Sequence, residues 1–364
     1  MNLGPEIALA ASARDWPDRV HRFLLDHGGG RVRVRVMGAE QALADQYEVL
    51  VIDDVCSFLT PRLVRSLREL GREIVGVYSP VDAPDAKRHL LESGITDVIE
   101  SDASAEEFLT VAAGTLMQPR PNLVAVPKDH NTFRVGVIGP LGGVGATEVA
   151  IGLASALSAS RSTLLLDLDQ HNPSVAQRLD LPLHPNLMTA VDSAHHSGDL
   201  DEAIVDFEGL GIVGGLADPG NQELPAIEIE GLLDDVGGLG YEVLVADLGS
   251  LAADRFHVLR FTALIAVGLA TPVGMSRLVR TVQSFASITG PDDVVAVVNR
   301  VGTGGRRRAE IKSEMARLMP GMPLVLLPED RALEGAAWDG TRPSRGPFAR
   351  ALGRIAELIA EAMP

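Results

Sequence analysis

The chain has 364 residues, which is more than one hydrophobic core usually spans, so its length predicts two domains. Its formal net charge of -17 argues against specific nucleic-acid binding as the main function, because neutralising phosphates needs a basic surface. The single cysteine excludes an intramolecular disulfide, and no long apolar run or signal-peptide pattern is present, so we expect a cytoplasmic protein without a transmembrane segment.

The first domain, residues 1–116, alternates short apolar runs with amphipathic segments. We expect its helices to include residues 61–70 and 83–93, and its strands at residues 7–11, 32–36, 49–52, 74–78 and 97–99. This alternation predicts a small doubly wound parallel α/β sheet. The segment Arg31–Val36 places three arginines on one face, which an anionic partner could use, but the pattern favours a charged edge strand.

Residues 117–132 contain several prolines and no apolar periodicity, and we expect them to be a linker. The second domain then covers residues 133–364. Its strands are expected at residues 133–138, 162–166, 211–213, 242–246, 263–267, 294–298 and 324–327. Most of these runs are apolar throughout, which is typical of strands buried on both faces of a mostly parallel sheet.

A glycine-rich segment lies between the first strand of the second domain and a helix expected over residues 147–157. Gly142, Gly143 and Gly145 allow backbone N–H groups to converge on a phosphate, and the helix dipole favours an anion there. Thr147 is placed to hold a magnesium ion. A glycine-rich turn without a ligand is the alternative interpretation of this segment alone.

Polar residues also end three later strands of this domain. They are Asp167 and Asp169, then Asp247, and then Asn299 with Arg300. Carboxylates at the carboxyl ends of parallel strands are where a nucleotide-binding α/β fold holds magnesium and water. The order of these features predicts a P-loop site.

With these motifs, the second domain resembles the ParA/MinD group of deviant Walker ATPases, whose loop reads Lys-Gly-Gly-x-Gly-Lys-Thr. The resemblance implies bound ATP with magnesium. It places Asp169 at the position that orients the attacking water, and Thr147 with Asp247 at the metal. The implied nucleotide-binding residues are Gly142, Gly143, Val144, Gly145, Ala146, Thr147, Asn299, Arg300 and Pro328, with Glu329 and Asp330 in the loop that closes the base pocket.

Two lysines of the family pattern are missing. Leu141 stands where the family has the lysine that reaches the partner's nucleotide across a dimer, and Ala146 stands where it has the lysine that grips the phosphate. Losing one charge-assisted contact costs roughly 1.5–3 kcal/mol of binding, and a trans-acting cation can contribute about 10³–10⁵ in rate. We therefore expect binding to survive these losses better than hydrolysis.

The first domain resembles a flavodoxin-like response-regulator receiver. Asp53 falls on the phosphoacceptor position and Ser79 on the conserved hydroxyl position of that family. The acidic pair that would hold magnesium is replaced by Ala11 and Ser12, and the lysine by Ser101. This pattern predicts a pseudo-receiver that serves for docking, with Asp53 not phosphorylated.

A pseudo-receiver fused to such a domain resembles the CpaE/TadZ proteins, and most closely their actinobacterial septum-site-determining relatives, the Ssd group. The resemblance implies a spatial regulator of the division septum, or of polar pilus or secretion machinery, that binds protein partners. Two alternatives stay open: a slow ATPase whose nucleotide cycle drives homodimerisation and relocation, and a protein controlled by phosphorylation.

Two further segments carry features of partner binding. Residues 306–308 are three arginines that we expect at the start of a helix, either as a binding cluster or, as the pattern favours, as a solvated turn. The last helix has an apolar stripe that could contact a membrane, but its acidic residues favour packing onto the domain. This stripe consists of Phe348, Leu352, Ile355 and Ile359.

Overall fold

A computed structural model describes residues 4–117, 132–196, 200–222, 224–250, 261–286 and 293–363. The described residues form two compact units, the first containing strands β1 to β5 and the second containing strands β6 to β13. Apart from its end residues Met117 and Thr132, the expected linker lies outside the described residues. The domain boundaries therefore stay a prediction.

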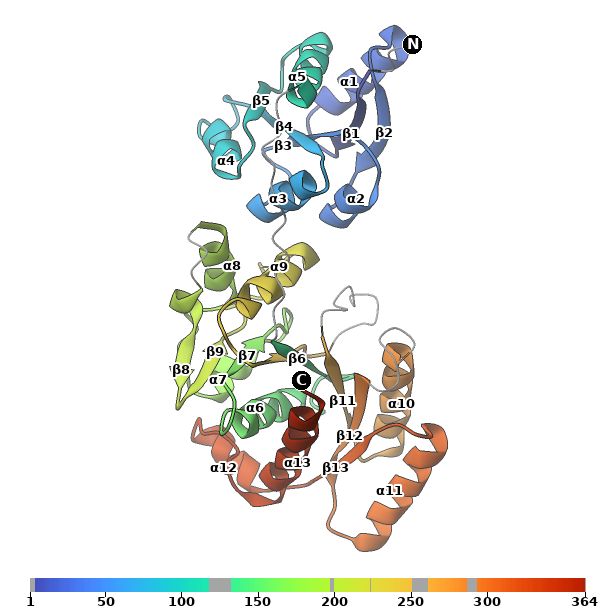
Figure 1. Cartoon of the computed structure of the whole chain (residues 1–364), viewed down its shortest axis with the longest axis vertical. Coiled ribbons are helices and arrows are strands. Elements are labelled where there is room, and N and C mark those ends of the chain that lie inside the picture. Colours follow the sequence, from blue (N-terminus) through green and yellow to red (C-terminus); the bar gives the residue numbers. More distant parts are fainter. Residues whose placement is uncertain are drawn as a thin grey trace. The chain divides into compact units, whose positions relative to one another are not determined.

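The first unit is a five-stranded parallel sheet in the order β2-β1-β3-β4-β5 (Figure 1). This order is flavodoxin-like, so the expected fold is confirmed. Strand β2 lies at one edge of the sheet, as its arginines indicated. The elements are β1 Glu6–Ala10, α1 Trp16–His27, β2 Arg31–Val36, α2 Ala39–Ala44, β3 Val49–Asp53, α3 Pro61–Glu69, β4 Glu73–Tyr78, α4 Ala86–Glu92, β5 Asp97–Glu100 and α5 Ala105–Met117.

Strand β1 shows why helices cover both faces of this sheet. Successive side chains of a strand point to opposite faces, and both sets are apolar here. Ile7 and Leu9 are buried in a cluster with residues of α1 and α5. Ala8 and Ala10 are buried in a cluster with residues of α2, α3 and α4.

The second unit is built on an eight-stranded sheet in the order β13-β12-β11-β6-β10-β7-β9-β8. All neighbouring strands are parallel except β8 and β9. The elements up to the centre of the sheet are β6 Phe133–Ile138, α6 Ala146–Leu157, β7 Thr163–Asp167, α7 Val175–Arg178, α8 Leu187–His196, a 3₁₀ turn Asp201–Ala203, β8 Val205–Phe207, β9 Leu210–Val213, α9 Ala226–Gly237 and β10 Val243–Asp247. The remaining elements are β11 Ala263–Leu269, α10 Pro272–Ala286, β12 Val294–Val301, α11 Gly305–Leu318, β13 Leu324–Pro328, α12 Ala332–Trp338 and α13 Gly346–Ala362.

The sequence predicted every strand of this sheet except β8. That strand has only three residues and pairs antiparallel with β9 through a two-residue hairpin. Glu208 and Gly209 in the hairpin have φ values of 54° and 80°. Positive φ at both positions matches the twist of the strands, but Glu-Gly is not a usual hairpin signal.

Helices cover both faces of the second sheet, and each face has its own core. One cluster joins the sheet to α8, α9, α10 and α11, and the other joins it to α6, α7 and α13. Helix α13 lies beside α6 (Figure 1). Its stripe of Phe348, Leu352, Ile355 and Ile359 is at most 5% exposed, so the expectation that this stripe packs onto the domain is confirmed. No described helix is long and apolar enough to cross a membrane.

Candidate functional site

The carboxyl ends of the central strands of the second sheet meet at one edge, and the motif residues lie there. Strand β6 lies between β10 and β11 in the sheet. Strands β7 to β10 lie on one side of β6, and strands β11 to β13 lie on the other. Asp247 is in register with Val137 on one side and with Asp167 on the other. This is the topological switch point at which open α/β sheets bind ligands.

The glycine loop after β6 has the backbone conformation that its composition indicated. Gly143 and Gly145 have φ values of 79° and 90°. A Cβ atom at Gly145 would lie 2.5 Å from Nδ2 of Asn299, which in turn donates a 2.9 Å hydrogen bond to the carbonyl of Val144. Asn299 thus holds the loop in place, and only glycine fits at position 145.

A cavity of about 500 Å³ lies over the loop. It brings together most of the residues that the sequence assigned to phosphate and water. Leu141 is 41% exposed at its rim, whereas Ala146 is 7% exposed. The lining residues are Leu141, Gly142, Gly143, Val144, Gly145, Ala146, Thr147, Glu148, Asp169, Asn172, Ser174, Arg178, Gly249 and Ser250.

Asp169 is fixed in this cavity by the backbone around it. Its Oδ1 accepts hydrogen bonds from the N–H groups of His171 and Asn172, at 3.1 Å and 2.9 Å. A Cβ atom at Gly249 would lie 1.9 Å from Oδ2 of Asp169. The glycine after the β10 strand end therefore makes room for the Asp169 carboxylate.

Asp167 and Asp247 form a buried pair of carboxyl groups on neighbouring strands, and each is 0% exposed. Burial raises the pKa of Asp167 to about 8, and the charge of Asp247 adds to this rise. The hydrogen bonds that Asp167 accepts from backbone N–H groups act in the opposite direction and lower its pKa. Burial also raises the pKa of Asp247 to about 6, against the lowering effect of the Thr147 hydroxyl and the Gly249 N–H. Burial and the like charges on adjacent strands make simultaneous ionisation of both groups unfavourable.

The residues at this pair fit a magnesium ion. Oδ1 of Asp247 accepts a hydrogen bond from the Gly249 N–H at 3.1 Å, but Oδ2 is buried and has no hydrogen-bond partner among the residues that the structure describes. A buried carboxylate oxygen without a donor, beside the hydroxyl of Thr147, is the oxygen donor set that Mg²⁺ uses together with phosphate oxygens and water. Within the described ranges, no group of three or more His, Cys, Asp or Glu could hold a metal by itself.

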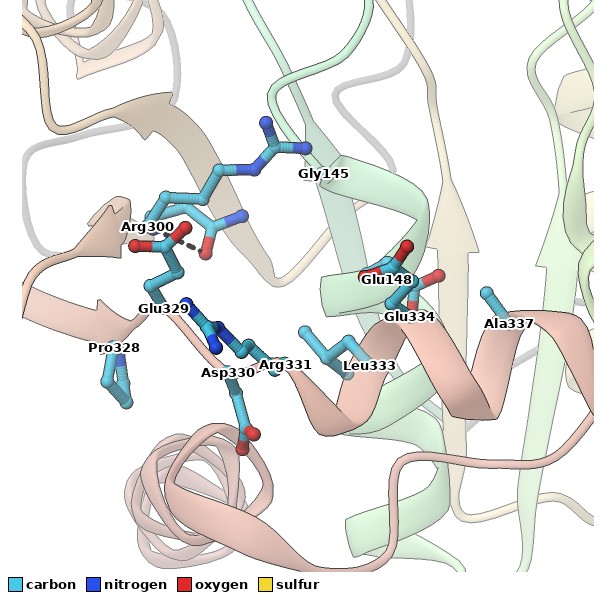
Figure 2. A pocket seen from close by; sticks show the side chains of 11 residues that line it. Gly145, Glu148, Arg300, Pro328, Glu329, Asp330, Arg331, Leu333, Glu334 and Ala337 are labelled. Atoms are coloured by element: carbon cyan, nitrogen blue, oxygen red, sulfur yellow. Dashed lines mark hydrogen bonds between the residues drawn. The ribbon is translucent and has the colours of Figure 1, made fainter.

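A second cavity of about 360 Å³ shares Gly145 and Glu148 with the first. Arg300 and Glu329 lie on one side of it, and Glu148 and Glu334 lie on the other (Figure 2). Its lining contains the residues that the sequence assigned to the base pocket: Asn299, Arg300, Pro328, Glu329 and Asp330.

Two residues of the candidate site were missed from the sequence. Glu148 and Arg178 received no role there, although both line the cavity over the loop. The position of Glu148 directly after Thr147 was a usable signal. No local pattern marks Arg178, which reaches the cavity from the end of α7.

In the first unit, Asp53 lies at the end of β3 and is 0% exposed. Its Oδ2 accepts hydrogen bonds from the Ser12 hydroxyl at 2.6 Å and the Trp16 indole N–H at 2.7 Å, and its Oδ1 accepts from Arg14. Arg14 also pairs with Asp54. Although burial opposes it, these donors and the Arg14 charge lower the pKa of Asp53.

No family model and no curated protein matches this chain. Among solved structures, the MinC:MinD cell division complex of Aquifex aeolicus matches with a TM-score of 0.52 and 14% identity, over 64% of this chain and 98% of that one. A ParA family ATPase of Chlorobium tepidum TLS matches with 0.51 and 15%, over 62% and 98%. The septum site-determining protein MinD of Pyrococcus horikoshii OT3, complexed with Mg-ADP, matches with 0.50 and 18%, over 64% and 97%. At these identities, the likeness shows that the second unit has the ParA/MinD ATPase fold.

Proposed function

We propose that this chain uses its ParA/MinD-type fold as a spatial regulator that acts by binding protein partners at a division septum or a cell pole. The observation that carries this proposal is the cavity over residues 139–147. Its glycine backbone is complete, but both positions that would carry lysine are apolar, Leu141 and Ala146. A site of this kind retains the shape of a nucleotide site without its main charges.

The role in positioning is supported by the functions of the proteins with similar structures. One is a septum site-determining protein, and another is a cell division protein in complex with a protein partner. We infer that the present chain likewise works through a protein partner of division, pilus or secretion machinery, as in the CpaE/TadZ and Ssd groups. It would be a cytoplasmic protein recruited to its target.

The site would hold ATP with magnesium weakly. The loop N–H groups of residues 142–147 would bind the phosphates, and Thr147 with Asp247 would bind the metal. Magnesium would supply neutralisation of phosphate charge. The Leu141 and Ala146 side chains add none, so the chain's own residues bind and orient but stabilise little developing charge.

A slow ATPase that homodimerises through its nucleotide cycle is the second candidate. The observation that favours it is the Asp169 carboxylate, which lies in the same cavity as the loop and could orient an attacking water. It would need a cation in place of the missing lysines.

We further infer that the first unit is a docking module and that Asp53 does not accept a phosphoryl group. Arg14 occupies the acidic cluster where a metal would otherwise neutralise charge, and Asp53 is covered by donors. Incubation with acetyl phosphate and magnesium should leave the mass of the protein unchanged. A phosphoaspartate at residue 53 would favour control by phosphorylation instead.

The proposed function is tested by imaging the fluorescently tagged full-length chain in its native host. We expect discrete signal at septa or poles, and recovery of a division, pilus or secretion protein after crosslinking in the cell. Uniform signal at every stage of growth, with no such partner crosslinked, would contradict the proposal.

A further inference from the structure

Arg178 is a buried cation in the wall of the phosphate-loop cavity. Its side chain is 8% exposed and forms a forked pair with Glu148, in which Nη2 lies 3.1 Å from Oε2 and Nε donates to Oε1. Nη1 donates to the carbonyls of Ala336 and Thr341, at 3.1 Å and 3.0 Å. The guanidinium is therefore held in one orientation at the edge of the cavity.

Glu148 places a carboxylate in the first turn of α6, directly after Thr147. The first turn of a helix favours an anion, because its N–H groups are unpaired and the helix dipole is positive there. In a phosphate-binding loop this is the region that a phosphate occupies. In this chain, Glu148 lines both cavities beside the loop, and its carboxylate pairs with Arg178.

The charges of the cavity can be counted from its described lining. Arg178 is the basic residue among them, and Glu148 and Asp169 are the acidic ones. A phosphate that enters next to the glycine loop would meet one basic residue of this lining, Arg178, and Arg178 is already paired with the Glu148 carboxylate. It would also be repelled by that carboxylate.

We propose that Arg178 is the phosphate-binding cation of this chain, and that Glu148 is a resident anion which an incoming phosphate must displace. The guanidinium fork that now binds a carboxylate has the geometry to bind a phosphate in the same way. Its two bonds to backbone carbonyls leave Nη1 in place during the exchange, so the cation need not leave its position.

This proposal rests on the proposed function only in assigning a phosphate ligand to the same cavity. It replaces the missing lysine contact with an arginine from α7, and it identifies polyphosphate groups as the ligand class. A nucleotide and free pyrophosphate share this chemistry, and the experiment separates them.

The test is calorimetric titration of the full-length chain with three probes: ADP with magnesium, pyrophosphate with magnesium, and adenosine. Glu148→Gln removes the resident charge and should strengthen pyrophosphate binding at least tenfold. If the ligand is a nucleotide, the affinity for ADP should increase by a similar factor, and ADP should bind more tightly than pyrophosphate. The affinity for adenosine should not increase. Adding Arg178→Gln should return the affinity for pyrophosphate to the level of the natural chain or below.

Glu242→Gln is the matched control, because it removes one carboxylate from the exposed Arg161–Glu242 ion pair, neither of whose residues lines the two cavities. It should leave all three affinities unchanged. Unchanged pyrophosphate binding in Glu148→Gln would overturn the proposal whether or not the Arg178 variant folds. A tenfold gain that persists after Arg178→Gln would overturn it as well.

The two proposals can fail separately. Localisation of the tagged chain does not depend on the affinity of Glu148→Gln for pyrophosphate. Conversely, loss of localisation would leave the calorimetric result unaffected.

Discussion

At the scale of single residues, Ala146 stands where a lysine would add a contact to a phosphate in the loop. Ala146→Lys would add one charge-assisted contact to the cavity, and we expect nucleotide binding with magnesium to strengthen by roughly one to two decades. Calorimetric titration with ATP and magnesium measures this change. Leu141→Lys should be needed in addition before a nucleotide-dependent dimer forms and turnover appears.

Ala159→Lys is a suitable control for this experiment, because it adds the same charge at an exposed position just after the same helix. It should leave binding unchanged. Equal affinity in Ala146→Lys and the natural chain would mean that the loop does not bind a phosphate.

The buried pair of Asp167 and Asp247 predicts how stability depends on pH. Burial and mutual repulsion raise the pKa of Asp167 to about 8, well above its ordinary value of 3.8, so the folded state keeps a proton that the unfolded state releases. The contribution of this group is therefore fully present below pH 3.8 and is lost as the pH rises towards 8. The slope is at most about 1.4 kcal/mol per pH unit for one proton.

Asp167→Asn should remove this slope. Urea denaturation in the presence of EDTA at pH 5, 6, 7 and 8 compares the two chains, and their difference in free energy of unfolding should shift in favour of the variant as the pH rises. Asp339→Asn, which changes an exposed carboxyl of the same unit, is the control. A pH-independent difference between Asp167→Asn and the natural chain would contradict the assigned burial effect.

Of the residues that the structure brings together at the candidate site, the sequence indicated those that belong to a loop motif or follow a strand. Thr147, Asp169, Asp247 and Asn299 reach one edge because parallel strands end there together. The Glu148–Arg178 pair was not predictable in this way. It depends on how the four-residue helix α7 packs against α6, 30 positions apart in the sequence, and no periodic pattern specifies that contact.

The first unit also contains a tertiary contact that the sequence did not indicate. The positions of Asp53 and Ser12 indicated an altered receiver-like pocket, but Arg14 was not identified. Its pairing with Asp53 and Asp54 requires the chain after β1 to turn back over the end of β3, which depends on tertiary structure.

At the scale of elements, two glycines in adjacent helices should respond in opposite ways to alanine. Gly152 in α6 packs against α13, and a Cβ atom there would lie 2.3 Å from Cδ1 of the buried Leu352. Gly152→Ala should therefore destabilise the chain by about 1–3 kcal/mol through overpacking.

Gly353 in α13 provides the matched comparison, because a Cβ atom there would meet no atom within 4 Å. Gly353→Ala should stabilise the chain by about 0.5–1 kcal/mol, since alanine loses less backbone entropy in a helix. Chemical denaturation of both variants gives the two values. Stabilisation by both substitutions would show that α6 and α13 do not pack this closely.

The type and order of the long elements followed from sequence because their apolar patterns are strong. The alternation of buried strands and amphipathic helices identified two parallel sheets. Strand β8 was missed because it is short, lies at an edge and is half-buried, so that neither its length nor its hydrophobicity distinguishes it from a loop.

At the scale of the whole molecule, the two compact units predict two independently folding fragments. A fragment ending at residue 117 and one beginning at residue 131 should each be soluble and unfold cooperatively, because each sheet has buried clusters on both of its faces. Circular dichroism melts of the separate fragments test this expectation. Aggregation of the second fragment would mean that the boundary at 117–132 is wrong.

We propose that this fold keeps a phosphate-binding cavity but does not turn over ATP. The most direct measurement is phosphate release by the full-length chain with ATP and magnesium, compared with Asp169→Ala under the same conditions. We expect no release from the natural chain above the level of the variant, because the Leu141 and Ala146 side chains supply no positive charge at the transferring phosphoryl group. Turnover by the natural chain that disappears in Asp169→Ala would contradict it.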